Sequence, residues 1–223
     1  MVVPTEFEVH AREMIETQLR RRGIRDERVL EAMLRVPRHE FVPQALASAA
    51  YEDRPLPIGQ AETISQPYMV AVMTEALQIE LGDRALEVGT GSGYQAAILA
   101  WLGATVFSIE RNPRLAVEAR ERLARLGYER VQVISGDGSE GLAEHAPYNA
   151  VIVTAAAPAA SQGLVSQLAE DGRLVIPVGD MRHQDLMLYI KRHREIVTRV
   201  LDPCQFVPLI GKGGWPEGPP RFG

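Results

Sequence analysis

The spacing of hydrophobic positions divides the chain into a helical opening part and a later part in which strands and helices alternate. Over residues 5–22 the apolar side chains recur every three or four positions, which predicts an amphipathic helix. A second such helix is predicted to begin after Asp26, as its N-cap, and to end by Pro37. Residues 55–66 contain prolines and a glycine, which predict an irregular loop that leads into a helix beginning at Pro67.

From residue 83 onward, short apolar runs alternate with helical stretches, which is typical of a doubly wound α/β sheet. Two final runs of alternating residues, joined by a turn near His193, predict an antiparallel edge. We therefore expect a mostly parallel, Rossmann-like α/β sheet with an N-terminal helical subdomain and an antiparallel C-terminal edge. The strands are expected at 86–88, 104–110, 131–135, 150–153, 173–176, 185–191 and 195–200, and the helices between them at 95–102, 113–126 and 161–168.

Three consecutive strand ends in this part carry residues suited to a nucleotide-like ligand. The turn from Gly89 to Gly93 contains three alternating glycines, which let the backbone approach a ligand closely at the start of a helix. Such a turn alone is also compatible with a plain connection. Glu110 follows at roughly the 20-residue spacing at which an acid meets ribose hydroxyls. Asp137 lies at the third strand end between two glycines, and the three ends together predict a site for an adenosine-containing cofactor.

The glycine pattern leaves two cofactors open. Residues 91–96 also fit the dinucleotide fingerprint G-x-G-x-x-[GA], so NAD is not excluded. S-adenosyl-L-methionine fits better because it has no pyrophosphate, and the loop must then receive a methionine moiety. Glu87 and Asp137 suit its ammonium group and the N–H donors of its adenine. We expect S-adenosyl-L-methionine as the cofactor, with S-adenosyl-L-homocysteine as the product.

Ser65 and Gln66 lie at the entrance of the helix predicted at Pro67. A hydroxyl beside free backbone N–H groups and the positive end of a helix dipole forms a small anion-binding corner. A serine at this position is more commonly a plain helix cap, which is the interpretation that the residues alone favour. The anion-binding interpretation nevertheless stays open.

Composition and charge narrow the class of protein. The chain has 223 residues, 46% of them hydrophobic and 24% charged, as in an ordinary globular domain. The net charge of −5 and the pI near 5.6 argue against a nucleic-acid partner. Cys204 is the single cysteine, which excludes an internal disulfide and fits a reducing cytoplasm. The five histidines have no metal-ligand spacing, and no apolar run reaches membrane-spanning length. We expect a cytoplasmic monomer with no metal and no membrane contact.

Several linked motifs resemble the protein-L-isoaspartate (D-aspartate) O-methyltransferase family over residues 10–211. The glycine motif is shared by most methyltransferases, whereas the Thr63-Ile64-Ser65 loop and the Thr154-Ala155-Ala156 turn are much more specific to this family. Glu62 departs from the family pattern, where glutamine is expected, and Ser139-Glu140 stand where an aromatic residue is common. The resemblance rests on the segments 57–60, 63–71, 86–95, 136–138, 151–156, 174–179 and 206–209.

The resemblance implies methyl esterification, with S-adenosyl-L-methionine, of the free carboxylate of L-isoaspartyl and D-aspartyl residues in damaged proteins, which initiates their repair. The damaged proteins and peptides are the implied partners. Ser65 is then the family's active-site serine, and its loop holds the isoaspartyl carboxylate. The implied substrate contacts are Thr63, Ile64, Ser65 and Val207. The implied cofactor contacts are Glu87, Gly89, Thr90, Gly91, Ser92, Gly93, Glu110, Asp137, Gly138, Pro67, Tyr68 and Met69.

The chain is accordingly divided into three parts. Residues 1–82 form an N-terminal helical and substrate-loop region, residues 83–210 form the cofactor-binding α/β core, and residues 211–223 form a flexible tail rich in glycine and proline. Three rivals remain, namely a methyltransferase for RNA or a small molecule, a non-catalytic adenosine-binding module and a nicotinamide dehydrogenase.

Overall fold

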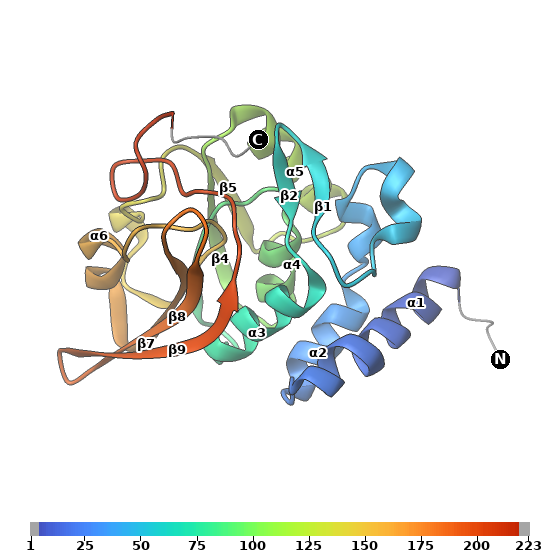
Figure 1. Ribbon diagram of the computed structural model, residues 1–223, viewed down its shortest axis with the longest axis horizontal. Helices are drawn as coiled ribbons and strands as arrows, with labels where there is room; N and C mark the ends of the chain where they lie inside the picture. Colours follow the sequence, from blue (N-terminus) through green and yellow to red (C-terminus); the bar gives the residue numbers. More distant parts are fainter. Residues whose placement is uncertain (1–4, 219–223) are drawn as a thin grey trace.

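A single seven-stranded sheet with the strand order β5-β4-β3-β6-β7-β8-β9 forms the centre of the computed structural model, which describes residues 5–218 (Figure 1). Strands β3 to β7 are mutually parallel, and β8 and β9 add to one edge in antiparallel pairing. This arrangement confirms the predicted Rossmann-like sheet with its antiparallel C-terminal edge. The strands are β3 (Arg84–Val88), β4 (Thr105–Glu110), β5 (Val131–Ser135), β6 (Tyr148–Val153), β7 (Leu168–Gly179), β8 (Gln184–Arg192) and β9 (Glu195–Cys204).

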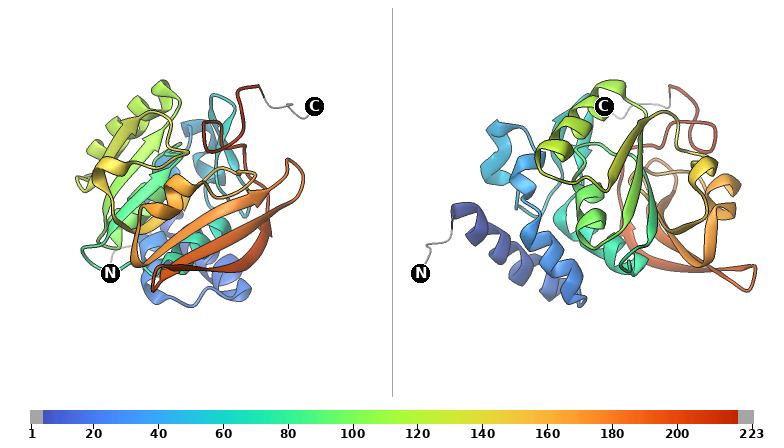
Figure 2. Two further views of the ribbon diagram at one scale, coloured as in Figure 1. Left: turned by 90° about the vertical axis from the view of Figure 1, so that its left-hand side faces the viewer. Right: turned by 180° about the vertical axis from the view of Figure 1, so that it is seen from behind.

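Apolar side chains cover both faces of this sheet because successive strand residues point to opposite sides. In β6, Ala150 and Ile152 belong to one buried cluster, whereas Val151 and Val153 belong to another. The first cluster also contains buried residues of the helices α3 (Pro67–Leu77) and α4 (Tyr94–Trp101), and the second contains Leu164 of α6 (Gln162–Ser166). Helix α5 (Pro113–Arg125) packs on β4 and β5. Helices thus pack on both faces of the sheet (Figure 2), and the carboxyl ends of the parallel strands lie together at one edge of it.

The N-terminal helices form a further layer outside α3 and α4. Helix α1 (Glu6–Met14) continues through a π-helical turn, η1 (Ile15–Leu19), and a 3₁₀ turn, η2 (Arg20–Arg22). Helix α2 (Glu27–Arg35) begins at the predicted N-cap, where the Asp26 carboxylate accepts the Arg28 N–H at 2.8 Å. Figure 1 shows α1 and α2 side by side at one end of the molecule, opposite the β7–β9 edge. Their buried faces join the cluster that contains α3 and α4.

Residues 55–66 form a hairpin where the sequence predicted an irregular loop. Strand β1 (Leu56–Gly59) pairs antiparallel with β2 (Glu62–Ile64). Gln60 and Ala61 make the turn with φ angles of 55° and 61°, although neither is a glycine or an asparagine. The prediction was wrong here because the sequence carries none of the usual hairpin-turn signals. The short 3₁₀ turns η3 (Arg38–Phe41) and η4 (Gln44–Ala49) precede this hairpin.

The segment after residue 210 also differs from its prediction. The Gly211 N–H donates to the Trp215 carbonyl at 3.0 Å, and the Trp215 N–H donates to the Leu209 carbonyl at 2.7 Å. Glu217 forms an ion pair with Arg111 at 2.9 Å. Residues of the segment 211–218, where the sequence predicted a flexible tail, are thus bonded to the rest of the chain, and residues 219–223 lie outside the described part of the chain. Within residues 5–218 no helix is both long and apolar enough to cross a membrane.

Candidate active site

The glycine turn after β3 is held in one shape by its two neighbouring strands. Gly89 has φ 97°, and a Cβ atom there would lie 2.3 Å from the Thr154 hydroxyl. The Gly89 N–H donates to the Ile109 carbonyl at 2.8 Å, while the Thr154 hydroxyl donates to the Gly89 carbonyl at 2.7 Å. Only glycine fits a backbone that is both left-handed and in this close contact. The turn is thus fixed between the ends of β4 and β6.

Glu110 ends β4 and binds the same turn. Its Oε2 atom accepts the Gly91 N–H at 2.9 Å, and its Oε1 atom accepts the Asn112 N–H at 2.8 Å. The side chain is only 7% exposed, so these bonds fix its position. The sequence predicted Glu110 as a partner for ribose hydroxyls. The carboxylate instead positions the glycine turn directly, and its remaining acceptor capacity is what a hydroxyl could use.

Glu87 lies beneath the turn on β3 and is fully buried. The Ser108 hydroxyl donates to its Oε2 atom, and the Thr90 and Ser108 hydroxyls are hydrogen-bonded at 2.5 Å. The Oε1 atom has no hydrogen-bond partner within residues 5–218. Burial raises the pKa of Glu87 from its ordinary 4.5 to about 8, and the nearby Glu110 carboxylate adds to the increase. A buried carboxyl oxygen without a partner marks a place where a polar ligand group fits.

The opposite wall is formed by the end of β2 and the short connection to α3, where Thr63, Ile64 and Ser65 lie. Gln66 occupies the N-cap position of α3 and provides no side-chain cap, so Ser65 does not cap this helix. The Ser65 carbonyl accepts a hydrogen bond from Arg38 Nη2 at 2.7 Å. The loop is tied on its outer side by Gln66 Nε2, which donates to the Asp53 carboxylate at 2.7 Å. The plain-cap interpretation of Ser65 is therefore not what the structure shows.

These two walls enclose one cleft of about 420 Å³, measured with the open solvent at its mouth included. Eight residues named from the sequence line it: Thr63, Ile64, Ser65, Glu87, Gly89, Thr90, Gly91 and Ser92. Val70, Met73, Tyr94, Gln95 and Thr154 line it as well. Thr154 had a sequence signal, because it opens the small-residue turn after β6. Tyr94 and Gln95 lie within the segment 86–95 that carries part of the family resemblance, but nothing in the sequence pattern marks them as cleft residues.

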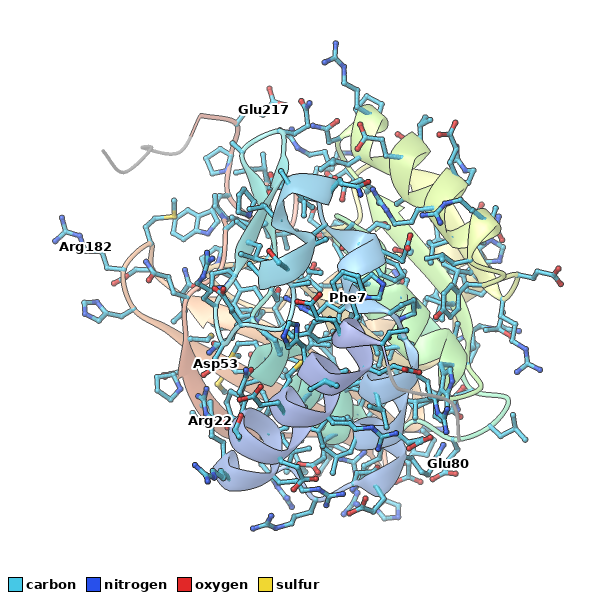
Figure 3. All side chains as sticks on the ribbon, turned by 90° about the vertical axis from the view of Figure 1, so that its right-hand side faces the viewer. Phe7, Arg22, Asp53, Glu80, Arg182 and Glu217 are labelled. Atoms are coloured by element: carbon cyan, nitrogen blue, oxygen red, sulfur yellow. The ribbon has the colours of Figure 1, made fainter. Side chains whose placement is uncertain are left out.

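The other predicted contacts do not line this cleft. Gly93 is the N-cap of α4 and has φ 88°. Pro67 is the first residue of α3, and Met69 lies in the first turn of the same helix. Tyr68 points elsewhere, since its hydroxyl donates to the Asp202 carboxylate at 3.0 Å and the Arg22 guanidinium lies 3.4 Å from its ring centre. Figure 3 shows Arg22 close to Asp53 on this outer face, and their side chains form an ion pair at 3.3 Å. The Tyr68 side chain therefore anchors the loop from behind.

Asp137 and Gly138 follow β5, and contacts within the chain hold both in place. The Asp137 carboxylate accepts bonds from the Ser139 N–H at 2.9 Å and from the Lys212 N–H at 3.0 Å. Burial raises the pKa of Asp137, but these hydrogen bonds outweigh it and hold the pKa below its ordinary value. A Cβ atom on Gly138 would lie 3.0 Å from Val88 and 3.1 Å from Ile109. A side chain at position 138 would thus crowd Val88 and Ile109, and the contact of Gly138 with the cofactor stays a prediction.

Val207 and Glu62 complete the set of residues named from the sequence. The Val207 carbonyl accepts the Ala156 N–H at 2.8 Å, so this backbone extends the pairing beyond β6 and does not reach the cleft. Glu62 is half-buried on β2, and burial together with the Glu110 carboxylate raises its pKa to about 7. The Glu62 carboxyl is therefore close enough to Glu110, which holds the glycine turn, for the charges of the two groups to interact.

Together, the Rossmann-like sheet and the cleft over its glycine turn define the class of this protein as a cofactor-binding α/β protein. The family model described as "Protein-L-isoaspartate(D-aspartate) O-methyltransferase (PCMT)" matches residues 10–214, and the chain belongs to this family. The match ends at residue 214 and not at residue 211, so the start of the segment predicted as a flexible tail lies within the family pattern.

Known relatives agree over nearly the whole chain. A protein-L-isoaspartate O-methyltransferase of Methanoculleus marisnigri is 57% identical over 203 residues, which are 91% of this chain and 92% of that protein. One from Koribacter versatilis is 54% identical and covers 95% of each chain. A Plasmodium falciparum protein described as a beta-aspartate methyltransferase, solved with S-adenosyl-L-homocysteine, matches with a TM-score of 0.78 and 26% identity over 93% of this chain and 99% of its own.

Proposed function

We propose that this protein transfers a methyl group from S-adenosyl-L-methionine to the free carboxylate of L-isoaspartyl and D-aspartyl residues in damaged proteins, which initiates their repair. The observation that carries the proposal is the single cleft in which the glycine turn faces the Thr63-Ile64-Ser65 loop. Family membership supports the same activity, because the matched family and the relatives at 54–57% identity bear that name.

The glycine-turn wall has the properties that a cationic cofactor needs. Glu87 offers a buried oxygen without a partner within residues 5–218, and this oxygen suits the ammonium of the methionine moiety. Glu110 holds the turn and retains acceptor capacity for ribose hydroxyls. The Glu87 oxygen without a partner favours S-adenosyl-L-methionine over NAD, because only the former brings an ammonium group to it, whereas Glu110 suits the ribose of either cofactor.

The Ser65 wall suits an anionic acceptor. A carboxylate is already ionised near pH 7, so the reaction requires no strong general base. S-adenosyl-L-methionine, held by Glu87 and Glu110, would supply the methyl group to a carboxylate oxygen and leave as neutral S-adenosyl-L-homocysteine. The Ser65 hydroxyl and the first turn of α3 orient the carboxylate. Holding the reacting atoms in line contributes on the order of 7 kcal/mol or more.

Labelled methyl transfer to a synthetic isoaspartyl peptide, run beside its normal aspartyl twin, tests this function. We expect label in the isoaspartyl peptide alone, and we expect mild alkali to release it because methyl esters are labile. Equal labelling of both peptides would refute the specificity. Cofactor binding without transfer to either peptide would indicate a non-catalytic adenosine-binding module, and an alkali-stable product would indicate a different methyltransferase.

A further inference from the structure

Arg38, at the start of η3, is a fully buried arginine without an acidic partner. Its Nε atom donates to the Ala50 carbonyl at 2.6 Å, and Nη2 donates to the Ser65 carbonyl at 2.7 Å. Its Nη1 atom has no hydrogen-bond partner among residues 5–218, and no ion pair of Arg38 is formed in that part of the chain. The side chain is 0% exposed. A whole positive charge is therefore enclosed without a countercharge of its own.

Such an arrangement is costly, because an ion loses its hydration when it is buried. The groups around Arg38 offset this loss only through dipoles and an aromatic face. Its guanidinium carbon lies 4.8 Å from the ring centre of Tyr94, and the titratable groups that face it are Tyr51 and Tyr94. Burial lowers the pKa of the guanidinium, which nonetheless stays protonated as arginines in proteins do. Two hydrogen bonds to carbonyls could be made by a neutral side chain, so they leave the charge itself unexplained.

The position of Arg38 accounts for this charge. Both residues that it contacts on the cleft side, Ser65 and Tyr94, line the cleft. The guanidinium thus lies directly behind the wall that carries the Ser65 hydroxyl. Its bond to the Ser65 carbonyl polarises that peptide unit and strengthens the N–H of the same unit as a donor. In a water-poor wall a positive charge acts over a longer distance than it would in solvent.

We propose that Arg38 is a positioning residue, which acts through the Ser65 loop as the resident positive charge for the isoaspartyl carboxylate. This inference rests on the proposed function, because it assigns the anion at Ser65 to the substrate. It gives a reason why an arginine, and not a neutral donor, joins the Ala50 and Ser65 backbones. The methyl ester product has no charge at this place, so Arg38 favours the substrate over the product.

A pair of peptides separates this role from a structural one. We would measure the affinity of the S-adenosyl-L-homocysteine-bound enzyme for an isoaspartyl peptide and for the same peptide with the carboxylate replaced by a neutral carboxamide. Wild-type enzyme should bind the anionic peptide at least tenfold more tightly. Arg38→Met should reduce this preference to less than threefold, whereas a purely structural role predicts that both affinities fall together and the preference stays. Arg173→Met is the matched control, because Arg173 also donates to a carbonyl, that of Ala76, near the far end of α3.

Arg38→Lys keeps the test decisive if the methionine variant does not fold. A buried lysine has a lowered pKa, so its charge is lost at a pH where arginine keeps it. Glu62 and Glu87 also titrate at the cleft in this pH range, so wild type and Arg173→Met set the baseline. The anionic preference of Arg38→Lys should be present at pH 6 and disappear by pH 9.5, a loss at least fivefold larger than that of wild type or of Arg173→Met. A preference in Arg38→Lys that changes with pH no more than that of wild type would overturn the inference. A wild-type enzyme that methylates no isoaspartyl peptide would instead refute the proposed function.

Discussion

The two walls of the cleft carry buried groups of opposite charge and are held by different means. The glycine-turn wall contains the acids Glu87 and Glu110 and is fixed by hydrogen bonds between adjacent strands. The Ser65 wall has Arg38 behind it, and Arg38 and Asp53 of the N-terminal region hold its loop. Each wall thus suits the charge of its proposed ligand: the acids suit a sulfonium cofactor, which favours the ionised form of Glu87, and the arginine suits a carboxylate. The glycine-turn wall, or cofactor wall, is therefore part of the sheet, whereas the Ser65 wall, or substrate wall, depends on contacts from the N-terminal region.

The largest effect is expected from a change that distorts the cofactor wall itself. Gly89→Ala should weaken S-adenosyl-L-homocysteine binding at least a hundredfold (about 2.7 kcal/mol), because the new Cβ would lie 2.3 Å from the Thr154 hydroxyl. Calorimetric titration gives this affinity directly. Gly127→Ala is the control, since Gly127 also has positive φ but has open space around it. Its variant should lose about 1–2 kcal/mol of stability and keep its affinity. Equal affinities in both variants would contradict a rigid turn.

A change in the substrate wall should affect chemistry without affecting the cofactor. Ser65→Ala should lower kcat/KM for an isoaspartyl peptide about tenfold to a hundredfold, the effect of losing a hydrogen bond to a charged group worth roughly 1.5–3 kcal/mol. Cofactor affinity should stay within twofold of the wild-type value. Peptide turnover and melting temperature are measured on the same variant. A less stable but fully active Ser65→Ala would show that the hydroxyl has only a structural role.

Glu87 makes a prediction about pH. Its folded-state pKa of about 8 lies above its ordinary 4.5, so the folded protein binds the extra proton between these values. The stability that this proton confers is present below pH 4.5 and is lost as the pH rises through 8. Glu87→Gln cannot ionise, so its melting temperature should exceed that of wild type by an amount that grows between pH 5 and pH 8. Thermal unfolding at pH 5, 7 and 9 checks this, and a constant difference would contradict it.

The same variant should bind the cofactor about tenfold more weakly, because a neutral amide replaces a charge-assisted bond. A cationic ligand favours the ionised form of Glu87, so wild-type affinity for S-adenosyl-L-methionine should rise with pH up to about 8. Titrations across this pH range should show the rise in wild type and no comparable rise in Glu87→Gln. An affinity of wild type that does not depend on pH would place the ammonium group elsewhere.

The smallest effect is expected at the end of the described chain. Glu217 pairs with Arg111 at 2.9 Å, but its side chain is 85% exposed. Glu217→Ala should therefore change stability by less than about 0.5 kcal/mol and cofactor affinity by less than twofold. Chemical denaturation and titration check these values. A large loss of cofactor affinity would mean that the ion pair, and not the backbone of residues 211–213, holds this segment over Asp137.

The sheet and the cofactor wall could be predicted from the sequence because both depend on local pattern. Alternating apolar residues, a glycine turn and acids at strand ends occur at short range, and the structure brings Glu87 and the turn together as expected. The β1–β2 hairpin could not be predicted, since Gln60 and Ala61 adopt positive φ without glycine. In the segment 211–218, composition suggested looseness, but the acceptors Asp137 and Ser139 lie about 75 residues earlier in the chain.

Side-chain direction was the second limit on prediction. Periodicity places Tyr68 in the first turn of α3 but does not reveal that its hydroxyl binds Asp202 on the outer face. Similarly, nothing in the sequence marks Arg38 as fully buried, because an arginine is ordinarily exposed. Both positions depend on contacts across 12 to 134 residues of chain. The substrate wall is accordingly the part of the site that sequence alone describes least.

The most direct measurement of the central claim is a time course in which an isoaspartyl peptide is incubated with the enzyme and S-adenosyl-L-methionine. Chromatography separates the isoaspartyl peptide, its aspartyl twin and the methyl ester. If the cleft esterifies the isoaspartyl carboxylate to initiate repair, the ester should form first, and the aspartyl twin should then accumulate as methanol is released. An isoaspartyl peptide that stays unchanged, or a methylated product that survives mild alkali, would contradict the account.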